Sequence, residues 1–413
     1  MTSDPGLFSV IIPVFNKWNL TKQCLESLKK ETVGVAYEVI VVDNGSSDET
    51  KENLDSLGHA LFGANFTSIH LPTNRNFGPA CNLGAANAQT PYLFFLNNDT
   101  LLTKNWYQPL INLLDRDPSI GAVGPVLLYP DKTIQHAGIV FSMTGPIHIY
   151  RYFPVNHPIL AHEKTFQALT AAALMLRRDL FLKLGGFYEE YKNGFEDVDL
   201  CLQIRSQGLK LICTPKATIF HLESQTEGRH EDHKINGMIL KKRCGQMYHV
   251  DLHMQGLKDG LEPFVDDTLD LSLRLPDAEE KRLLASTENM PISYWQELIT
   301  NNPLCVSVRK HIARLAEEQN DRRLAMAMAS EIALAEKTKA NYLKLLSYEK
   351  EFGDTNPTLF AEAKKILTTI QRSTENLNLV KSKLRLAINM RDKFLVRLYD
   401  AKVKEIERNL TRQ

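Results

Sequence analysis

The 413-residue sequence has little of what marks a secreted or membrane-spanning protein. Its six cysteines, at positions 24, 81, 201, 213, 244 and 305, are scattered and include no CxxC pair. This argues against a disulfide framework and against a zinc site, and favours reduced thiols. The N-terminal segment lacks a basic stretch and a long apolar core, so no secretory signal is predicted. No apolar run approaches the ~20 residues that span a bilayer. We therefore expect a soluble, cytoplasmic protein, and a peripheral position at the inner face of the cell membrane stays open.

The chain also lacks an excess of charge of either sign. Lys and Arg together number 49, and so do Asp and Glu, so the formal net charge is zero. Nucleic-acid-binding proteins normally carry a basic excess, so no nucleic-acid partner is expected. Hydrophobic residues make up 43% of the chain and charged residues 24%, an ordinary globular balance. The length suggests about two or three domains.

Buried strands that end in polar residues dominate the first 100 positions. Strands are predicted at 9–15, 37–50, 67–74 and 92–96, the second of them ending in a polar loop, and helices at 19–30 and 78–88. A strand, a helix and a strand within about 35 residues form a βαβ unit with parallel strands. The predicted fold class is therefore α/β. In such sheets ligands bind beyond the carboxyl ends of the strands, which here carry Asp43 and the run Asn97–Asn98–Asp99.

The middle of the chain is mixed, and the last third is helical. Strands are predicted at 121–130 and 209–221, and a helix at 196–208 that begins with acidic residues. Residues 256–278 are predicted to be a linker. From 279 to 413 strong helix formers predominate, with apolar stripes such as Leu324, Met328 and Ile332. An all-α C-terminal domain is expected, either a helical bundle or tetratricopeptide-like hairpins, although no clean repeat of about 34 residues is present.

Six segments, taken in their order, resemble the family 2 glycosyltransferases of the GT-A fold. They are SVIIPVFN, VIVVDNGSSDET, NRNFGPACNLGA, FLNNDT, GGFYEEYKNGFEDVDLCLQIRSQG and IFH, within residues 7–225. Inside the family, the bacterial rhamnosyltransferase-type members are most similar. The resemblance implies a Rossmann-like GT-A domain over 1–255 that transfers a sugar with inversion. The donor would be a UDP- or dTDP-sugar, dTDP-rhamnose among the candidates, and the acceptor a hydroxyl of a saccharide, a lipid-linked sugar or a protein. The helical domain would hold such an acceptor or form a homodimer.

The resemblance also implies a divalent metal, Mn²⁺ or Mg²⁺, beside the donor diphosphate. The D-x-D signature of the family falls on Asn97, Asn98 and Asp99, so an amide replaces the first carboxylate. Hard cations prefer oxygen ligands, and Asp99 is expected to be the main anionic one. Asn97 and Asn98 are expected to contact the nucleotide sugar. His221 matches a further metal ligand in some relatives, and a purely structural role for it is equally open.

Glu196 and Asp197 are the predicted catalytic residues. Inverting transfer needs a carboxylate that removes a proton from the acceptor hydroxyl, and the base of the family falls on Asp197. Glu196 is expected to position the acceptor, and Asp199 to be a surface or supporting group. The competing interpretation is that these acids only cap the helix and compensate its dipole. The segment 170–187 resembles the acceptor side of the family.

The remaining matches concern the nucleotide. Asp43 falls on the residue that accepts a hydrogen bond from a pyrimidine imide. The other residues implied to bind the nucleotide sugar are Pro13, Phe15, Asn16, Asn44, Asn76, Gly78 and Asn82. Arg75 is either a phosphate contact or a solvated surface side chain.

Two rival functions compete with this interpretation. A dinucleotide-dependent oxidoreductase would need a GxGxxG turn after the first strand, and this sequence has NKWNLTKQ there. A binding protein on a catalytically dead glycosyltransferase scaffold is the stronger rival, because Asn97 removes one carboxylate. The presence of Asp99, Asp197 and His221 favours an active enzyme.

Overall fold

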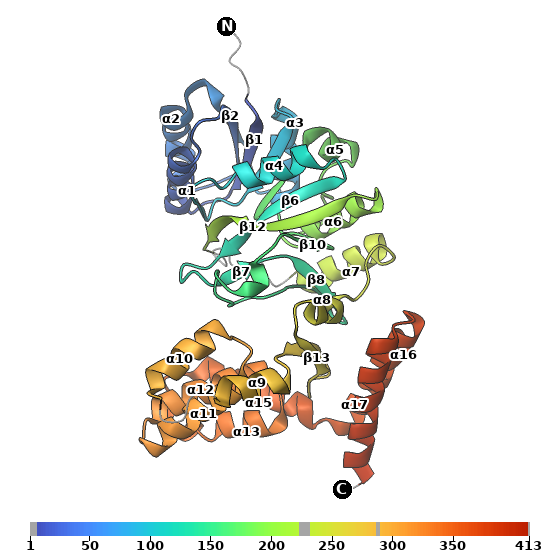
Figure 1. The fold of residues 1–413 in the computed structure, drawn as a ribbon. Helices are drawn as coiled ribbons and strands as arrows, with labels where there is room; N and C mark the ends of the chain where they lie inside the picture. Colours follow the sequence, from blue (N-terminus) through green and yellow to red (C-terminus); the bar gives the residue numbers. More distant parts are fainter. Residues whose placement is uncertain (1–5, 223–231, 286–289, 412–413) are drawn as a thin grey trace. The chain divides into compact units, whose positions relative to one another are not determined.

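The computed structural model describes residues 6–222, 232–285 and 290–411 (Figure 1). The chain forms two compact units. The first comprises residues 1–141 and 145–249, and the second comprises residues 142–144 and 250–413.

A ten-stranded mixed sheet forms the centre of the first unit, in the order β10-β12-β6-β11-β4-β1-β2-β3, with β5 on β12 and β7 on β6. Its strands are β1 (Phe8–Val14), β2 (Tyr37–Asp43), β3 (Phe66–His70), β4 (Tyr92–Leu96), β5 (Thr100–Leu102), β6 (Ile120–Leu128), β7 (Ile134–His136), β10 (Lys164–Phe166), β11 (Ala173–Arg177) and β12 (Lys210–His221). Strands β1 to β4 pair in parallel, whereas β11 runs antiparallel to β4 and β6. The α/β fold class is confirmed.

Helices cover the sheet, which explains why its central strands are apolar on both faces. The helices of this unit are α1 (Trp18–Glu31), α2 (Thr50–Phe62), α3 (Phe77–Asn87), α4 (Gln108–Arg116), α5 (Arg178–Lys183), α6 (Glu196–Ser206) and α7 (His233–Cys244), with short 3₁₀ turns at Gly63–Asn65 and Pro158–Leu160. All residues of β4 are buried. Helix α3 packs closely because a Cβ at Gly84 would lie 2.6 Å from Cγ2 of Ile11. A separate two-stranded sheet joins β8 (Ile139–Ser142) and β9 (Gly145–His148).

The parallel strands bring the polar residues at their C-terminal ends to one edge of the sheet. Strands β1, β2 and β4 all end there, because each pairs in parallel with its neighbour. The short strand β5 then runs antiparallel to β12, with Thr100 opposite His221. This pairing was absent from the prediction, since three residues show no clear periodicity. It places the end of β12 beside the loop that follows β4.

The second unit is built mainly of helices, as predicted. They are α8 (Leu252–Lys258), α9 (Asp277–Ala285), α10 (Ile292–Asn301), α11 (Val306–Glu318), α12 (Arg322–Ala335), α13 (Lys339–Leu346), α14 (Glu349–Phe352), α15 (Pro357–Gln371), α16 (Ser373–Asn389) and α17 (Lys393–Thr411). One apolar cluster surrounds Trp295 and Met328, and another surrounds Tyr342 and Phe360. Among the described residues, no helix is long and apolar enough to cross a membrane.

All six cysteines are buried, and none forms a disulfide. Burial raises the pKa of the Cys24 thiol to about 12, although its hydrogen bond with Thr100 acts the other way. The thiol of Cys24 therefore stays protonated at neutral pH and behaves as a small apolar side chain.

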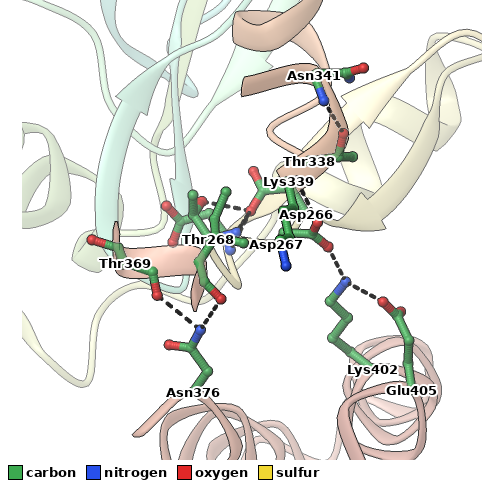
Figure 2. Close-up of polar contacts among 12 residues, drawn as sticks. Asp266, Asp267, Thr268, Thr338, Lys339, Asn341, Thr369, Asn376, Lys402 and Glu405 are labelled. Atoms are coloured by element: carbon green, nitrogen blue, oxygen red, sulfur yellow. Dashed lines mark hydrogen bonds and ion pairs between the residues drawn. The ribbon is translucent and has the colours of Figure 1, made fainter. Parts of the chain in front are cut away.

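The segment expected to be a linker contains the hairpin of β13 (Glu262–Val265) and β14 (Leu271–Arg274). The turn of this hairpin anchors the helices of the second unit (Figure 2). Asp266 Oδ1 accepts hydrogen bonds from the amide and hydroxyl of Thr268. Asp267 accepts a hydrogen bond from the Lys339 amide at the start of α13 and one from the Lys402 ammonium on α17, at 3.1 Å and 2.7 Å. The turn thus ties two helices that are far apart in the sequence.

Lys402 is the buried member of this network. Its side chain is only 8% exposed, and its ammonium also donates to Glu405 at 2.9 Å. Burial lowers the pKa of Lys402, but the hydrogen bonds to Asp267 and Glu405 outweigh this and leave the pKa raised. The ammonium is therefore charged inside the unit and depends on its carboxylate partners.

We expect Asp267→Ala to lower the free energy of unfolding by about 1–3 kcal/mol, because it removes one partner of a buried charge. Urea denaturation followed by the helical circular dichroism signal measures this. Asp354→Ala removes an exposed carboxylate from the same unit and should change the free energy by less than about 0.5 kcal/mol. Equal midpoints for both variants would show that the turn does not stabilise the unit.

Candidate active site

Asp99 and His221 meet where the loop after β4 approaches the end of β12. Oδ1 of Asp99 lies 3.1 Å from Nε2 of His221. Two backbone features bring them together: Thr100 pairs with His221 in the sheet, and the Leu222 amide donates to the Asp99 carbonyl at 2.9 Å. Both side chains are nearly buried. The two predicted metal ligands are therefore adjacent.

Gln135 on β7 fixes the protonation of the His221 ring. Nε2 of Gln135 donates to the backbone carbonyl of His221 at 2.9 Å, so its Oε1 must be the atom 2.6 Å from Nδ1 of His221. An amide oxygen only accepts, and Nδ1 must therefore carry a proton. Two states of Nε2 are then possible. Either it carries a second proton and donates a hydrogen bond to Asp99, or it is unprotonated and its lone pair points between Asp99 and Asn97. Sequence reasoning missed Gln135, which has no motif around it.

The state in which Nε2 of His221 is unprotonated suits a divalent cation. A carboxylate oxygen and an imidazole nitrogen 3.1 Å apart have the separation of neighbouring ligands around one ion. A histidine ligand typically donates its other ring N–H to a fixed acceptor, as His221 does to Gln135. Asn97 Nδ2 lies 3.2 Å from the same Nε2. Residues 6–222, 232–285 and 290–411 hold no group of three or more His, Cys, Asp or Glu side chains arranged for a metal.

The other residue of the polar triplet, Asn98, faces α1. Its Nδ2 donates to the hydroxyl of Thr21 at 2.9 Å. The buried Thr21 is part of the inner face of α1. The amide of Asn98 thereby holds the loop after β4 against this helix. Contact of Asn97 and Asn98 with a nucleotide sugar stays a prediction.

Asp197 is joined to this pair through two consecutive residues. Its Oδ2 accepts a hydrogen bond from the Ala171 amide at 3.1 Å, and the next carbonyl, that of Ala172, accepts one from the Asn97 amide at 3.0 Å. The same carboxylate also accepts from the Val198 amide at 2.8 Å. Asp197 and the loop that carries Asp99 thus lie on the two sides of one short backbone segment. That segment leads into β11 and belongs to the stretch that resembles the acceptor side.

Glu196 shapes the turn in front of Asp197. Its Oε2 accepts from the Gly194 amide at 2.6 Å, and the carboxylate is buried. The turn has positive φ angles of 50° at Asn193 and 74° at Phe195, a conformation that costs energy for a bulky side chain. The contact of Glu196 with an acceptor remains a prediction, and the structure gives the carboxylate a role in holding this backbone.

Asp199 is not a surface residue. It is 2% exposed and forms an ion pair with Arg243 of α7, and the Tyr191 hydroxyl donates to it at 2.9 Å. Helix α6 turns Asp199 away from solvent, toward α7. A buried carboxylate needs such partners, because an unpaired charge is costly there. The guanidinium of Arg243 also lies 3.5 Å from the ring centroid of Tyr188.

Asp43 ends β2 and has two partners on neighbouring strands and loops. Its Oδ1 accepts from the Ser46 amide at 2.9 Å, and its Oδ2 lies 3.1 Å from Nδ1 of His70. His70 ends β3, directly opposite Asp43 in the parallel register. Its Nε2 lies 2.9 Å from Asp55. Sequence reasoning missed His70, although the paired ends of two predicted parallel strands were a usable signal.

The pKa of His70 is raised. Burial alone would lower it, but the hydrogen bonds and charges of Asp55 and Asp43 outweigh that effect. A raised folded-state pKa stabilises the fold below the unfolded-state value of about 6.5, and this gain is lost as the pH rises through the folded-state pKa.

Stability should therefore fall slightly between about pH 6 and pH 8.5 in the wild type, and less in His70→Gln. Because the imidazole is 37% exposed, solvent screening limits the difference to less than about 1 kcal/mol. Urea unfolding of both proteins at the two pH values measures it. A larger pH dependence in His70→Gln than in the wild type would refute the assignment.

The end of β1 is fastened to the loop after β2. The Asn16 amide donates to the Ser46 hydroxyl at 2.8 Å, and the Ser47 amide donates to Oδ1 of Asn16 at 2.8 Å. Asn16 itself has a φ of 56°, which asparagine tolerates better than most residues. Phe15 is 42% exposed beside it, and Pro13 is the only residue of β1 that is not fully buried. An exposed ring and a fixed turn therefore lie next to Asp43.

Two of the side chains predicted to bind the nucleotide, Asn44 and Asn82, also hold protein loops in place. Asn44 is buried, accepts from the Arg75 amide at 2.8 Å, and donates to the side chain of Asn74 and the carbonyl of Asn76, each at 3.0 Å. It thus fixes the turn that precedes α3, where Asn76 has a φ of 69°. The side chain of Arg75 is exposed. These contacts give Asn44 a positioning role.

Asn82 holds the loop after α5 in a similar way, through hydrogen bonds from its side chain to the backbone of that loop. It accepts from the Phe187 amide at 2.8 Å and donates to the carbonyl of the same residue at 2.9 Å. Gly78, one turn earlier on α3, faces this loop too, and a Cβ there would lie 3.3 Å from Cβ of Phe187. The small residues of α3 therefore admit the 186–189 segment at close range.

The first unit is similar in sequence to known proteins. Residues 9–179 match the family described as Glycosyl transferase family 2. The first unit contains a glycosyl transferase family 2 domain. Its mixed sheet with flanking helices agrees with the GT-A fold that the resemblance predicts.

Curated relatives match this family 2 domain but extend beyond it. The O-antigen biosynthesis protein RfbC of Myxococcus xanthus is 32% identical over 52% of this chain and 17% of its own length. The uncharacterized protein y4gI of Sinorhizobium fredii is 33% identical over 55% of this chain and 25% of its own length. An N-acetylglucosaminyl-diphospho-decaprenol L-rhamnosyltransferase of Mycobacterium tuberculosis is 26% identical over 46% of this chain and 68% of its own. The chain thus spans at most a quarter of the first two relatives.

Solved structures are more distant. A mannosyltransferase from Pyrobaculum calidifontis in complex with GDP-Man and Mn²⁺ gives a TM-score of 0.46 at 17% identity, covering 91% of this chain and 88% of that one. GalNAc-T7 with UDP, GalNAc and Mn²⁺ also gives 0.46, at 19% identity over 54% and 44% of the two chains.

Proposed function

We propose that the chain is an inverting, metal-dependent glycosyltransferase that moves a sugar from a UDP- or dTDP-sugar to a hydroxyl of a saccharide, a lipid-linked sugar or a protein. One observation carries the proposal. The Asp99–His221 pair and Asp197 flank the segment Ala171–Ala172, so a candidate diphosphate site and a candidate base share one edge of the sheet. An inverting transfer needs these two groups near one anomeric carbon.

Asp99 and His221 are the residues that would hold Mn²⁺ or Mg²⁺. Such an ion supplies positive charge that stabilises the departing nucleoside diphosphate. Gln135 keeps the His221 ring in the tautomer that presents Nε2 toward Asp99. The replacement of the first signature carboxylate by Asn97 makes the binding of the ion depend more on Asp99.

Asp197 is the proposed general base. The amides of Ala171 and Val198 orient its two oxygens, so the carboxylate has one fixed direction. It takes the proton of the acceptor hydroxyl as that oxygen attacks the anomeric carbon in line with the leaving diphosphate. The hydroxyl oxygen forms the new glycosidic bond, and the bond from carbon to the diphosphate oxygen breaks. Glu196 supports Asp197 by fixing the preceding turn.

Asp43 is the proposed recognition group for the base. A buried carboxylate at the end of β2 suits uracil or thymine, because both present an imide N–H. A rhamnosyl donor is supported by the Mycobacterium tuberculosis relative, whose name describes an L-rhamnosyltransferase. A surface-polysaccharide acceptor is supported in the same way by the O-antigen biosynthesis protein.

A donor screen tests the proposal. UDP- and dTDP-sugars, with dTDP-rhamnose among them, are incubated with the full chain in Mn²⁺ and in EDTA, and release of the nucleoside diphosphate is measured. We expect release with at least one donor that EDTA abolishes. Absence of release for every donor, together with absence of nucleotide binding in a thermal shift assay, would refute the enzyme.

A second candidate function is a nucleotide-sugar-binding module with weak or no catalysis. Asn97 favours it, because an amide takes the place of a carboxylate beside His221. The same screen separates the two. Binding of a donor in the thermal shift assay without release of nucleoside diphosphate would support the module over the enzyme.

A further inference from the structure

Two stacked tyrosines, the half-buried Tyr129 and the exposed Tyr152, belong to the part of the sheet order that lies across β4 from Asp43. The rings of Tyr129 and Tyr152 are parallel within 6°, with centroids 5.2 Å apart. Tyr152 is 61% exposed, the largest exposure of any aromatic side chain among the exposed hydrophobic residues of the described chain. Arg151 lies over both rings and donates to the Tyr129 hydroxyl. A single exposed aromatic residue is ordinary, so exposure alone carries little.

The backbone beneath this pair is strained. Tyr150 and Tyr152 have φ angles of 61° and 67°, in the region that bulky side chains avoid. Such a backbone conformation costs energy, and the surroundings must hold it in place. Here the Tyr152 amide donates to the Ile134 carbonyl and the Ile134 amide to the Phe153 carbonyl, each at 2.7 Å. The chain thus holds an unfavourable turn that presents Tyr152 to solvent.

This turn is attached to the strand that orients His221. The partner of Tyr152 is Ile134, and the next residue on β7 is Gln135, which holds the His221 ring. Tyr129 follows β6, which pairs with β12. In the order of the sheet, β6 and β12 lie on one side of β4, and β1, β2 and β3 lie on the other. The tyrosines are therefore attached to strands on the His221 side of β4, and the candidate base-binding residues to strands on its other side.

We propose that Tyr129, Arg151 and Tyr152 form a subsite for a pyranose ring of a saccharide acceptor. This inference rests on the proposed function, and it selects a saccharide from the three acceptor classes. A pyranose has one face of C–H groups, which packs on the open face of an aromatic ring, and a rim of hydroxyls. Tyrosine combines a large apolar face with a polar tip and suits such amphipathic partners. The rigid turn fixes the ring in advance, which lowers the entropy lost on binding.

Saturation-transfer difference NMR on the full chain tests the subsite without any need for turnover. The probes are the methyl glycosides of glucose, galactose, mannose, rhamnose and N-acetylglucosamine. For at least one glycoside we expect saturation of ring C–H protons, kept in Tyr152→Phe and lost in Tyr152→Asn. Asparagine is used because it tolerates a positive φ and so keeps the turn while removing the ring. No saturation by any probe, or equal saturation in Tyr152→Asn, would overturn the subsite.

Kinetics distinguish a failure of the subsite from a failure of the proposed function. In an acceptor assay with saccharides, Tyr152→Asn should raise the acceptor KM about five- to tenfold, the size expected for loss of one aromatic contact. Acceptor-free release of nucleoside diphosphate should match that of the wild type. An unchanged acceptor KM in Tyr152→Asn would refute the subsite alone. A wild type that releases no nucleoside diphosphate would refute the proposed enzyme alone, because the NMR result does not depend on turnover.

Discussion

Asp197→Asn should reduce sugar transfer by about 10²–10⁴-fold, the contribution expected of a general base. Nucleotide affinity should change less than about twofold, because the candidate nucleotide contact Asp43 ends β2, whereas Asp197 lies in the first turn of α6. The physical reason is that an amide cannot accept the proton of the acceptor hydroxyl. Transfer rates at saturating donor, together with the affinity for the nucleoside diphosphate, measure the two effects. Loss of transfer with unchanged affinity is the signature of a base.

The structure identifies a side effect of this substitution that needs a control. Both Asp197 oxygens accept backbone N–H groups, so the amide nitrogen introduced by Asp197→Asn would face either Ala171 or Val198 as donor against donor. Thermal unfolding of the variant therefore accompanies the kinetics. Asp179→Asn, at an exposed acid on α5, serves as the matched neutral control. Full transfer activity in Asp197→Asn would refute the assignment of the base.

The strands at the centre of the sheet could be predicted from the sequence, because each is a continuous apolar run. Continuous apolar runs indicated β1, β2 and β4, and the polar residues after them indicated the ligand edge. The prediction that Asp99 and His221 belong together came from the family resemblance, because the two are 122 positions apart and meet only through the antiparallel pairing of β5 with β12. Such register depends on tertiary structure, and a strand of three residues leaves no periodic trace.

Supporting residues were the hardest to predict. Gln135 and His70 act through contacts between different parts of the chain. No motif surrounds Gln135, and the one signal for His70 was its place at the paired ends of two predicted parallel strands. Asn44 and Asn82 hold loops in the structure, a role that the sequence did not indicate, and their contact with a nucleotide stays a prediction. The segment 256–278 is predicted to be a linker, and the structure forms a hairpin there whose turn is rich in acids. Those acids are in fact the partners of Lys402 and of the α13 amide.

Asp99→Asn should weaken Mn²⁺ binding by more than about 100-fold, because changes in supporting residues alone typically cost 10–100-fold and this change removes the carboxylate itself. The substitution is nearly isosteric, so packing around His221 is kept. Gln135→Leu should weaken Mn²⁺ binding by about 10–100-fold, because it frees the His221 ring to adopt the other tautomer. Isothermal titration of the full chain with Mn²⁺, in the presence of UDP or dTDP, measures both.

Asn97→Asp provides a control that should strengthen Mn²⁺ binding, whereas the two other substitutions should weaken it. Its amide nitrogen lies 3.2 Å from Nε2 of His221, so a carboxylate there restores the first acid of the family signature beside the same ring. Oxygen ligands with negative charge strengthen the binding of hard cations, so Mn²⁺ affinity should rise about tenfold or more. The competing view is that Asp99 and His221 form only an ion pair within the protein. In that case Asp99→Asn would lower the melting temperature, and Mn²⁺ affinity would be the same in all three variants and the wild type.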